Sequence, residues 1–285
     1  MPLPLATVTV EMTDTARDHD AVALIVPLGI DTEFQRLERV DLPEGWNTSI
    51  LGEARSGQLA ALLTPPHPDA PARLGHVVSG RPGTLADAAW HPEPAARRRA
   101  AQDLAQDARR MAQDAGGGRR GLEAIVLDTA KRFAYGAIEG PDRWYTGHDA
   151  IPAVACAVGD CIDINTYLVA ALRTAGYDTA YLTCYFFDDD PDGIAAGMHC
   201  WVRTRHEGLI EDWDIAHFKK DGRADVHAAL NPVPGLRVAL AHGRDHVYRW
   251  NGLDIRLPIP SRPNWVLADG STIWGAPPVV TLSRD

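Results

Sequence analysis

Gly159-Asp-Cys-Ile-Asp-Ile-Asn165 opens the clearest helical pattern in the sequence. Apolar residues recur on one helical face after it, at Ile164, Leu168, Ala171 and Leu172. Gly176 ends the pattern, so Cys161 lies at or just before the first turn of the predicted helix. Unpaired N–H groups and the positive end of the helix dipole favour an anion there, which predicts a lowered pKa for the Cys161 thiol. A small buried apolar cysteine is the alternative.

Two short runs further along the chain, 199–204 and 209–213, are typical of strands joined by a tight hairpin turn. If the turn is centred on residues 206–207, His199 faces Asp214 directly across the ladder, on the same side of the sheet. A carboxylate opposite an imidazole fixes its tautomer and supports its protonated form. The prediction depends on the length of the turn, because a slip of one residue moves a side chain to the other face.

Cys161, His199 and Asp214 together supply the groups that thiol catalysis needs: a nucleophile, a proton acceptor and an orienting acid. They belong to three short motifs that follow one another along the chain: Gly159-Asp-Cys161, His199-x-Trp201 and Trp213-Asp214. These motifs resemble the catalytic motifs of the transglutaminase-like superfamily, a papain-related group of cysteine enzymes. The resemblance implies that Cys161 is the nucleophile, His199 the general base and acid, and Asp214 the residue that orients His199.

The predicted fold class is α+β, with a transglutaminase-like, papain-like core of helices packed on an antiparallel sheet. A small β-sandwich-like domain precedes it, since the β-rich N-terminus is similar to the strand domain of bacterial members. We expect a β-rich domain at 1–82 and a catalytic domain at 83–285, with its core at about 86–240. The clearest expected strands before the core are Ala6–Met12, Val22–Pro27, Phe34–Leu42 and Arg73–Val78, and the first expected helices are Pro94–Ala115 and Gly121–Phe133.

Composition excludes several classes of protein. The chain has 285 residues, a formal net charge of −10 and a pI near 5.5, so it lacks the basic patches of proteins that bind nucleic acid or anionic membranes. No apolar run approaches the ~18–20 residues that cross a bilayer, and no secretory leader is evident at the N-terminus. Four cysteines are too few for a disulfide framework, and we expect a cytoplasmic protein. The oligomeric state stays open.

The predicted function is a cysteine nucleophile that attacks an amide or ester carbonyl and passes through a thioester, most simply as an amidase or peptidase. Its substrate would be a peptide, a protein or a small amide or acyl compound. Two alternatives remain: an acyltransferase that resolves the thioester with an amine, forming an amide or a cross-link, and a non-catalytic binding scaffold. The backbone N–H of Cys161 is the candidate oxyanion donor, and Trp144 and Tyr145 are as typical of packing residues as of site residues.

No cofactor and no metal are predicted. The acidic stretch Asp188–Gly193 has carboxylates at alternate positions, like the opening of a calcium loop, but His199 stands where such a loop needs a bidentate Glu. A solvated acidic turn is therefore favoured. Strand alternation places Cys200 on the face opposite His199, and His217 is interpreted as a loop histidine. The other cysteines and histidines show neither a C-x2-C pair nor an H-E-x-x-H helix, which disfavours zinc.

Overall fold

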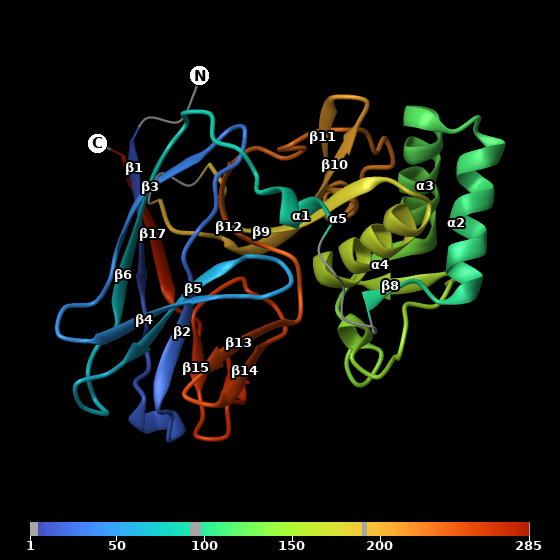
Figure 1. The fold of residues 1–285 in the computed structure, drawn as a ribbon. Helices are drawn as coiled ribbons and strands as arrows, with labels where there is room; N and C mark the ends of the chain where they lie inside the picture. Colours follow the sequence, from blue (N-terminus) through green and yellow to red (C-terminus); the bar gives the residue numbers. More distant parts are fainter. Residues whose placement is uncertain (1–4, 92–97, 190–192, 285) are drawn as a thin grey trace. The chain divides into compact units, whose positions relative to one another are not determined.

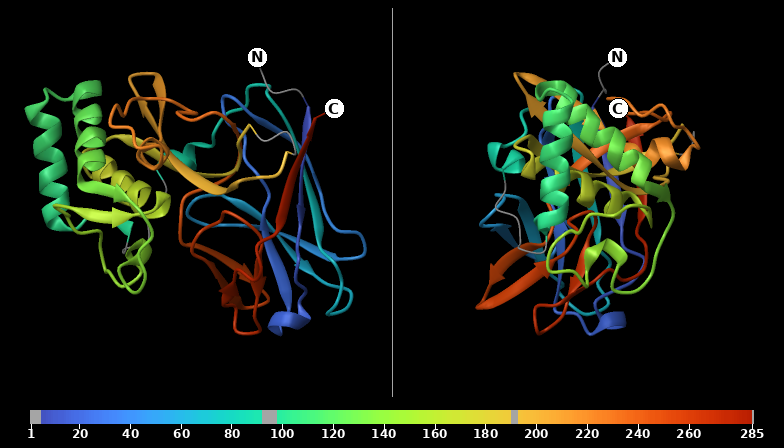
Figure 2. Two further views of the ribbon diagram at one scale, coloured as in Figure 1. Left: turned by 180° about the vertical axis from the view of Figure 1, so that it is seen from behind. Right: turned by 90° about the vertical axis from the view of Figure 1, so that its right-hand side faces the viewer.

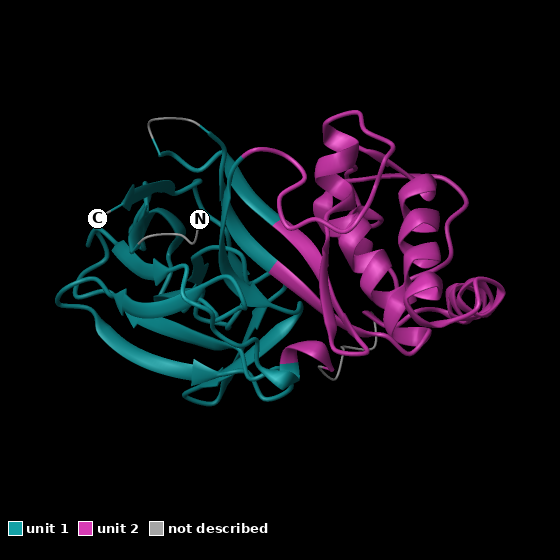
Figure 3. Cartoon of the chain, turned by 90° about the horizontal axis from the view of Figure 1, so that it is seen from above, with its two compact units in different colours: residues 1–88, 183–199, 235–285 teal, residues 89–182, 200–234 magenta. Residues whose placement is uncertain are grey.

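The computed structural model describes residues 5–91, 98–189 and 193–284 (Figure 1). The chain divides into two compact units, coloured separately in Figure 3. The first, which we call the β unit, consists of residues 1–88, 183–199 and 235–285. The second, the helical unit, consists of residues 89–182 and 200–234. Strands and helices both contribute, so the predicted α+β class and the β-rich N-terminal region are confirmed.

The β unit contains a four-stranded sheet in the order β17-β1-β6-β3 and a five-stranded sheet in the order β16-β15-β2-β5-β4. A separate hairpin is formed by β13 and β14. The bounds of these strands are β1 Ala6–Glu11, β2 Ala23–Pro27, β3 Arg36–Asp41, β4 Asn47–Gly52, β5 Leu59–Thr64, β6 Arg73–Ser79, β13 His246–Trp250, β14 Leu253–Leu257, β15 Asn264–Val266, β16 Thr272–Ile273 and β17 Val279–Arg284. The short helix η1 is Arg17–His19.

The five-stranded sheet is covered on both faces, which explains the uninterrupted apolar run in β2. Leu24 and Val26 pack in one cluster with Val8 and Leu74 of the four-stranded sheet, so the two sheets form a sandwich. Ile25 points into a second cluster, which contains residues of the β13–β14 hairpin. All five residues of β2 are buried as a result.

The last strand of the chain joins the first sheet, because β17 pairs antiparallel with β1, from Ala6 opposite Arg284 to Glu11 opposite Val279. β15 likewise pairs with β2. The compact units therefore group residues 235–285 with the N-terminal strands, a long-range pairing that no local pattern announces. The domain boundary at residues 82 and 83 stays a prediction.

Helices of the helical unit pack against one another, as the two views of Figure 2 show, with α2, α3 and α4 in mutual contact. Its elements are α2 Gln102–Asp114, α3 Gly118–Arg132, β7 Phe133–Tyr135, η3 Arg143–Tyr145, β8 Ala157–Gly159, α4 Cys161–Thr174, β11 Leu209–Trp213 and α5 Ile215–Lys220. The expected helix from Pro94 begins at Gln102 in the structure, and residues 92–97 lie outside the described ranges. Helix α1 spans Asp87–Trp90, and strand β12 spans Leu236–His242.

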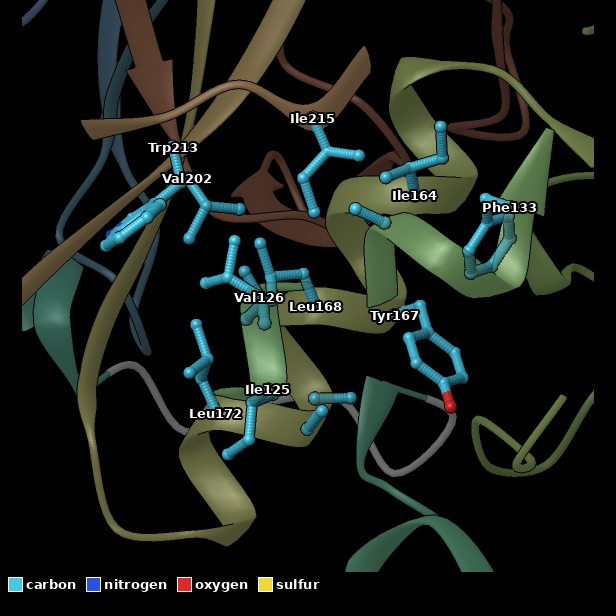
Figure 4. Close-up of a cluster of buried hydrophobic side chains, with 14 of the residues drawn as sticks. Ile125, Val126, Phe133, Ile164, Tyr167, Leu168, Leu172, Val202, Trp213 and Ile215 are labelled. Carbon is cyan, nitrogen blue, oxygen red and sulfur yellow. The ribbon is translucent and has the colours of Figure 1, made fainter. Parts of the chain in front are cut away.

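Helix α4 lies at the centre of the helical unit. Figure 4 shows Ile164, Leu168 and Leu172 of α4 facing side chains of α3, such as Ile125, and of the strands that follow α4 in the chain. Every residue from 163 to 172 is buried, so α4 is covered all round rather than on the single apolar face that its sequence predicts. The first turn of this helix is consequently held in a fixed position by the packing of the remainder.

Strands β9 (Asp178–Phe187) and β10 (Gly197–His206) contribute residues to both units, and the sheet order is β11-β10-β9-β12. The hairpin of β10 and β11 exists as predicted, but the predicted register is wrong. The ladder runs from His206 opposite Leu209 to Val202 opposite Trp213, so the turn is Glu207-Gly208. Both turn residues have positive φ, 49° and 80°, which matches a two-residue turn with glycine in second place.

The corrected register changes the partner of Asp214 but not its side of the sheet. β11 ends at Trp213, so Asp214 is not paired with His199 in the ladder. The shift is two residues, and side chains alternate with a period of two, so both side chains stay on one face. Inside the hairpin, Arg203 donates two hydrogen bonds of 2.8 Å to the Asp212 carboxylate, which fixes this register.

Among the residues that the structure describes, no helix combines the length and apolar character needed to cross a membrane.

Candidate active site at the start of helix α4

The first turn of α4 is closed by a reciprocal pair of aspartates. The Asp160 carboxylate accepts hydrogen bonds from the backbone N–H groups of Ile162 at 2.7 Å and Asp163 at 3.3 Å. The Asp163 carboxylate accepts one from the Asp160 N–H at 3.1 Å. This capping box satisfies donors that a helix start otherwise leaves unpaired. Cys161, the first residue of the helix, is thereby held at the position that the sequence predicts.

A glycine is required at position 159 because the backbone there lies close to the first turn of the helix and to Phe133. A Cβ atom at this position would lie 2.8 Å from Cβ of Asp163 and 3.2 Å from the Phe133 ring. Only glycine fits without displacing the capping box. The glycine of the Gly-Asp-Cys motif therefore has a packing role, which supports the placing of the cysteine beside it.

Trp144, which lies outside the helix, donates hydrogen bonds to both aspartates of the capping box. Its backbone N–H donates to Asp163 at 2.6 Å, and its indole Nε1–H donates to Asp160 at 3.0 Å. Trp144 and Tyr145 both have positive φ, 54° and 57°, a conformation that costs energy for bulky residues and is often found at functional sites. Because its indole N–H is bonded to Asp160, we assign Trp144 to positioning the helix start.

Two carboxylates this close repel each other when both are charged. Burial raises the pKa of Asp163 to about 6, and the negative charge of Asp160 acts in the same direction. Asp163 therefore changes its charge within the range in which many cysteine-based sites work. This pair was not singled out in the sequence, although the D-x-x-D spacing of a capping box is visible there.

Cys161 is half-buried, and its surroundings do not favour a resting thiolate. A hydrogen bond with the Cys200 side chain raises the pKa of the Cys161 thiol, and burial and the charge of Asp160 raise it further. The predicted lowering of this pKa is therefore wrong. The effect of the helix dipole on this pKa is outweighed by the Cys200 side chain, by burial and by the charge of the capping Asp160. A reaction at Cys161 consequently needs a base that removes the proton as it proceeds.

Cys200 faces α4. Asn165, one turn after Cys161, donates from Nδ2 to the Cys200 carbonyl at 2.8 Å and approaches the Cys200 Sγ at 3.4 Å. The sequence predicted that strand alternation places Cys200 and His199 on opposite faces of the strand. It did not predict that α4 covers the face on which Cys200 lies. His199 is thus the strand neighbour of a residue that contacts α4.

Asp214 and His217 form a buried pair. Asp214 is the N-cap of α5: one carboxylate oxygen accepts the His217 backbone N–H at 2.9 Å, and the other lies 3.0 Å from His217 Nδ1. The interpretation of His217 as a loop histidine is wrong, since it lies within α5 and is 6% exposed. An aspartate three residues before the histidine is the capping signal that would have located it.

The assignment of Cys161, His199 and Asp214 as catalytic residues stays a prediction. The acidic stretch Asp188–Gly193 lies in part outside the described residues, so the cation question there stays open as well.

Tyr135 lies beside the helix start, a residue that sequence reasoning missed. It is the register partner of Gly159 in the parallel pair of β7 and β8, and it is 38% exposed. Partial burial raises the pKa of Tyr135 to about 12, and charge on Cys161 and Asp160 adds to this. Its neutral hydroxyl is therefore available as a hydrogen-bond donor near Cys161 at any physiological pH.

A cavity of about 270 Å³ lies within the helical unit next to the capping box. Asp163 contributes to its wall, and most of the other lining side chains are apolar or aromatic, namely Phe133, Ile138, Tyr145, Pro152, Val154, Ala157 and Val158. Asp142 and His148, which are 2.9 Å apart, supply a polar edge. The cavity has the volume and lining of a subsite for one apolar side chain.

Comparison with known proteins agrees with this architecture. Residues 102–213 match the family model described as Transglutaminase-like superfamily. The match spans α2 to β11 and therefore includes Cys161, Cys200 and the hairpin. These residues form a transglutaminase-like domain, and the family assignment made from the three motifs is confirmed.

A solved structure shares the fold at low sequence identity. A structure named "Putative Cysteine Protease from Cytophaga hutchinsonii" has 13% identity and a TM-score of 0.50, over 98% of this chain and 96% of that chain. The periplasmic domain of TgpA from Pseudomonas aeruginosa has 13% identity and a TM-score of 0.40, over 78% of this chain and 90% of that chain. A search of curated proteins finds no match to the sequence. The family and fold point to cysteine-based catalysis in general.

Proposed function

We propose that this protein is a cysteine hydrolase that cleaves amide bonds of peptides, with Cys161 as its nucleophile. The observation that carries the proposal is the position of Cys161, half-buried at the first residue of α4 and fixed by the Asp160–Asp163 capping box. A nucleophile at a helix start has backbone N–H groups beside it that can stabilise an oxyanion. The similar fold of a structure named a "putative cysteine protease" supports a peptide as substrate.

In the proposed reaction, His199 takes the proton of Cys161 as the sulfur attacks the carbonyl carbon. The tetrahedral oxyanion is stabilised by the backbone N–H of Cys161, and His199 then returns the proton to the departing amine. Water hydrolyses the thioester with the same histidine as base. Asp214 orients the base, and His217 holds the Asp214 carboxylate through two contacts.

The cavity beside Asp163 suggests which peptides are cleaved. Its apolar walls are wide enough for a leucine or phenylalanine side chain, and a charged side chain would lose its hydration there. We therefore propose a preference for an apolar residue next to the cleaved bond. Peptides that differ only by Leu or Asp at that position are the matched substrates.

The test is product analysis on a quenched-fluorescent peptide library and on casein, with and without the amine monodansylcadaverine. Wild-type protein and the Cys161→Ala variant are compared, and Cys156→Ala is the control because Cys156 is an exposed cysteine. We expect new N-termini with the wild type and with Cys156→Ala, none with Cys161→Ala, and no effect of EDTA. Amine incorporation without cleavage would establish acyl transfer instead, and cleavage by Cys161→Ala would remove Cys161 as nucleophile.

A further inference from the structure

Asn165 is a polar residue in the buried part of α4. Its side chain is 0% exposed, and its amide Nδ2 donates a hydrogen bond of 2.8 Å to the Cys200 carbonyl oxygen. The same nitrogen lies 3.4 Å from the Cys200 sulfur. Cys200 belongs to β10 and lies 35 residues further along the chain. The Asn165 amide therefore connects the helix directly to the backbone of a distant strand.

The stability of the fold does not explain this asparagine. Asn165 Oδ1 is buried and accepts no hydrogen bond from any residue that the structure describes. A buried acceptor without a donor lowers stability, and a leucine, which has nearly the same shape, would avoid that loss. An unsatisfied buried group calls for another role, and the bond that Nδ2 makes to β10 indicates which one.

The hydrogen bond reaches β10 at a point that the hairpin with β11 does not hold. The ladder between these two strands ends with Val202 opposite Trp213, two residues after Cys200. The Asn165 amide thus fixes the strand one residue after His199. On α4, Cys161 and Asn165 are four residues apart, so they lie on one helical face. The face that carries the candidate nucleophile is therefore the face that holds β10.

We propose that Asn165 is a positioning residue, which holds the β10 backbone at Cys200 to α4 and thereby places His199 for the removal of the Cys161 proton. The inference rests on the proposed function, in which His199 is that base. The pKa of the Cys161 thiol is raised, so the proton has to be taken while the sulfur reacts. Such a transfer needs hydrogen-bond reach, and a small displacement of the strand that carries the base slows it.

The test compares the wild type with Asn165→Leu, which keeps the branched shape of the side chain and removes the amide donor. Asn264→Leu is the matched control. Asn264 is 1% exposed, its Nδ2 donates to the Arg262 carbonyl at 2.7 Å, and its Oδ1 likewise has no partner among the described residues. Asn165→Ala is a second variant that removes the same donor with a smaller side chain. Circular dichroism and the melting temperature show whether each variant is folded.

Two rates are measured between pH 6 and pH 10: peptide cleavage, resolved into kcat and KM, and alkylation of Cys161 by iodoacetamide, located by peptide mass spectrometry. In the Asn165 variants we expect kcat at pH 7 to fall on the order of 10-fold or more, with KM changed by less than about twofold. Alkylation of Cys161 should slow by a similar factor at pH 7. Its difference from the wild type should narrow towards pH 10, where hydroxide removes the proton without a histidine. Asn264→Leu should match the wild type in both rates.

A folded Asn165→Leu with wild-type kcat and wild-type alkylation would overturn the inference, and so would an equal loss at every pH. Loss of the fold in both Asn165 variants, with Asn264→Leu folded, would make Asn165 a structural residue and would overturn it too. Failure of the proposed function has a different signature, which is peptide cleavage by Cys161→Ala. The alkylation profile needs no substrate, so it is read independently of that result.

Discussion

The β unit contains a group of side chains of the types found in a hydrolase site. The helical unit contains a cysteine at the position expected of a nucleophile, the start of a helix. In the β unit, Ser56 Oγ lies 3.5 Å from His246 Nε2, and the Glu53 carboxylate accepts the Ser56 backbone N–H at 2.7 Å. His246 Nδ1 lies 3.2 Å from the Tyr248 hydroxyl. A hydroxyl, an imidazole and a carboxylate are thus assembled, as in a serine hydrolase.

The group in the β unit and the candidate site in the helical unit differ in how deeply they are buried. Ser56, His246 and Glu53 are each 2–3% exposed, so no substrate reaches them, whereas Cys161 is half-buried at a helix start. Burial also lowers the pKa of His246 to about 3, which makes it a weak base near neutral pH. The difference teaches that exposure and helix-terminal position, rather than the residue types, identify the candidate site.

The largest expected effect comes from removing the nucleophile in each set. Cys161→Ala should lower kcat/KM by on the order of 10³-fold or more, as loss of a catalytic nucleophile does. Ser56→Ala should leave kcat/KM unchanged, because Ser56 is a structural residue in this account. Initial rates on the cleaved peptide measure both, and circular dichroism controls for folding. A loss of activity in Ser56→Ala with intact structure would reverse the comparison.

Asp214→Asn tests the orienting acid and keeps the helix cap. Asparagine caps helices about as well as aspartate, so we expect the melting temperature to change little. The negative charge beside His217 is lost, and kcat should fall by about 10²–10⁴-fold, the range for removal of an orienting carboxylate. Unchanged kcat in a folded variant would show that Asp214 only caps α5.

Asp163 should make the stability of the protein fall as the pH rises. Its pKa is raised from 3.8 to about 6 in the fold, so the folded state binds the proton more tightly than the unfolded state. The stabilising contribution is complete below pH 3.8 and is lost as the pH rises through about 6. Urea unfolding between pH 4 and pH 7 should show this slope in the wild type, and Asp163→Asn should flatten it. An equal slope in both proteins would exclude this role.

His246 should act in the opposite direction. Because burial lowers its pKa from 6.5 to about 3, stability is lost as the pH falls from 6.5 towards 3. His246→Gln should reduce the acid sensitivity, measured as the change in melting temperature between pH 7 and pH 4. The Asp163→Asn variant is the control, since its effect has the other sign. A His246→Gln protein as acid-sensitive as the wild type would argue against a buried neutral imidazole.

The smallest effect is expected from the two tyrosines. Tyr135→Phe removes one exposed hydroxyl near Cys161 and should change kcat/KM by about tenfold, the value of one hydrogen bond of about 1.4 kcal/mol. Tyr248→Phe removes the buried hydroxyl beside His246 and should lower stability by about 1 kcal/mol with no change in kcat/KM. The reverse assignment of activity and stability effects would contradict the account.

Local pattern was enough to predict the elements that carry the site. The period of α4, its cap and its stop are encoded in adjacent residues, and so are β10 and β11 with the turn between them. The register was wrong by two residues because it depends on which pair adopts positive φ. Glycine suits the second place of such a turn, which makes Glu207-Gly208 the better choice.

What sequence reasoning missed are contacts between distant segments. That Asn165 of α4 contacts Cys200, and that β17 pairs with β1, follows from packing rather than from any local period. The direction of the Cys161 pKa was wrong for a related reason. The dipole rule considers the helix alone, but here the Cys200 side chain, burial and the capping aspartate raise the pKa of the thiol.

The most direct test of Cys161 as the nucleophile is to trap the acyl-enzyme. Wild-type protein is mixed with a p-nitrophenyl ester of an N-acylated leucine, quenched in acid within the first turnover, and examined by intact and peptide mass spectrometry. We predict one added acyl group, located on Cys161, that is removed by hydroxylamine and is absent in Cys161→Ala. Turnover of the ester with no acyl group on Cys161, or an acyl group on another residue, would contradict the account.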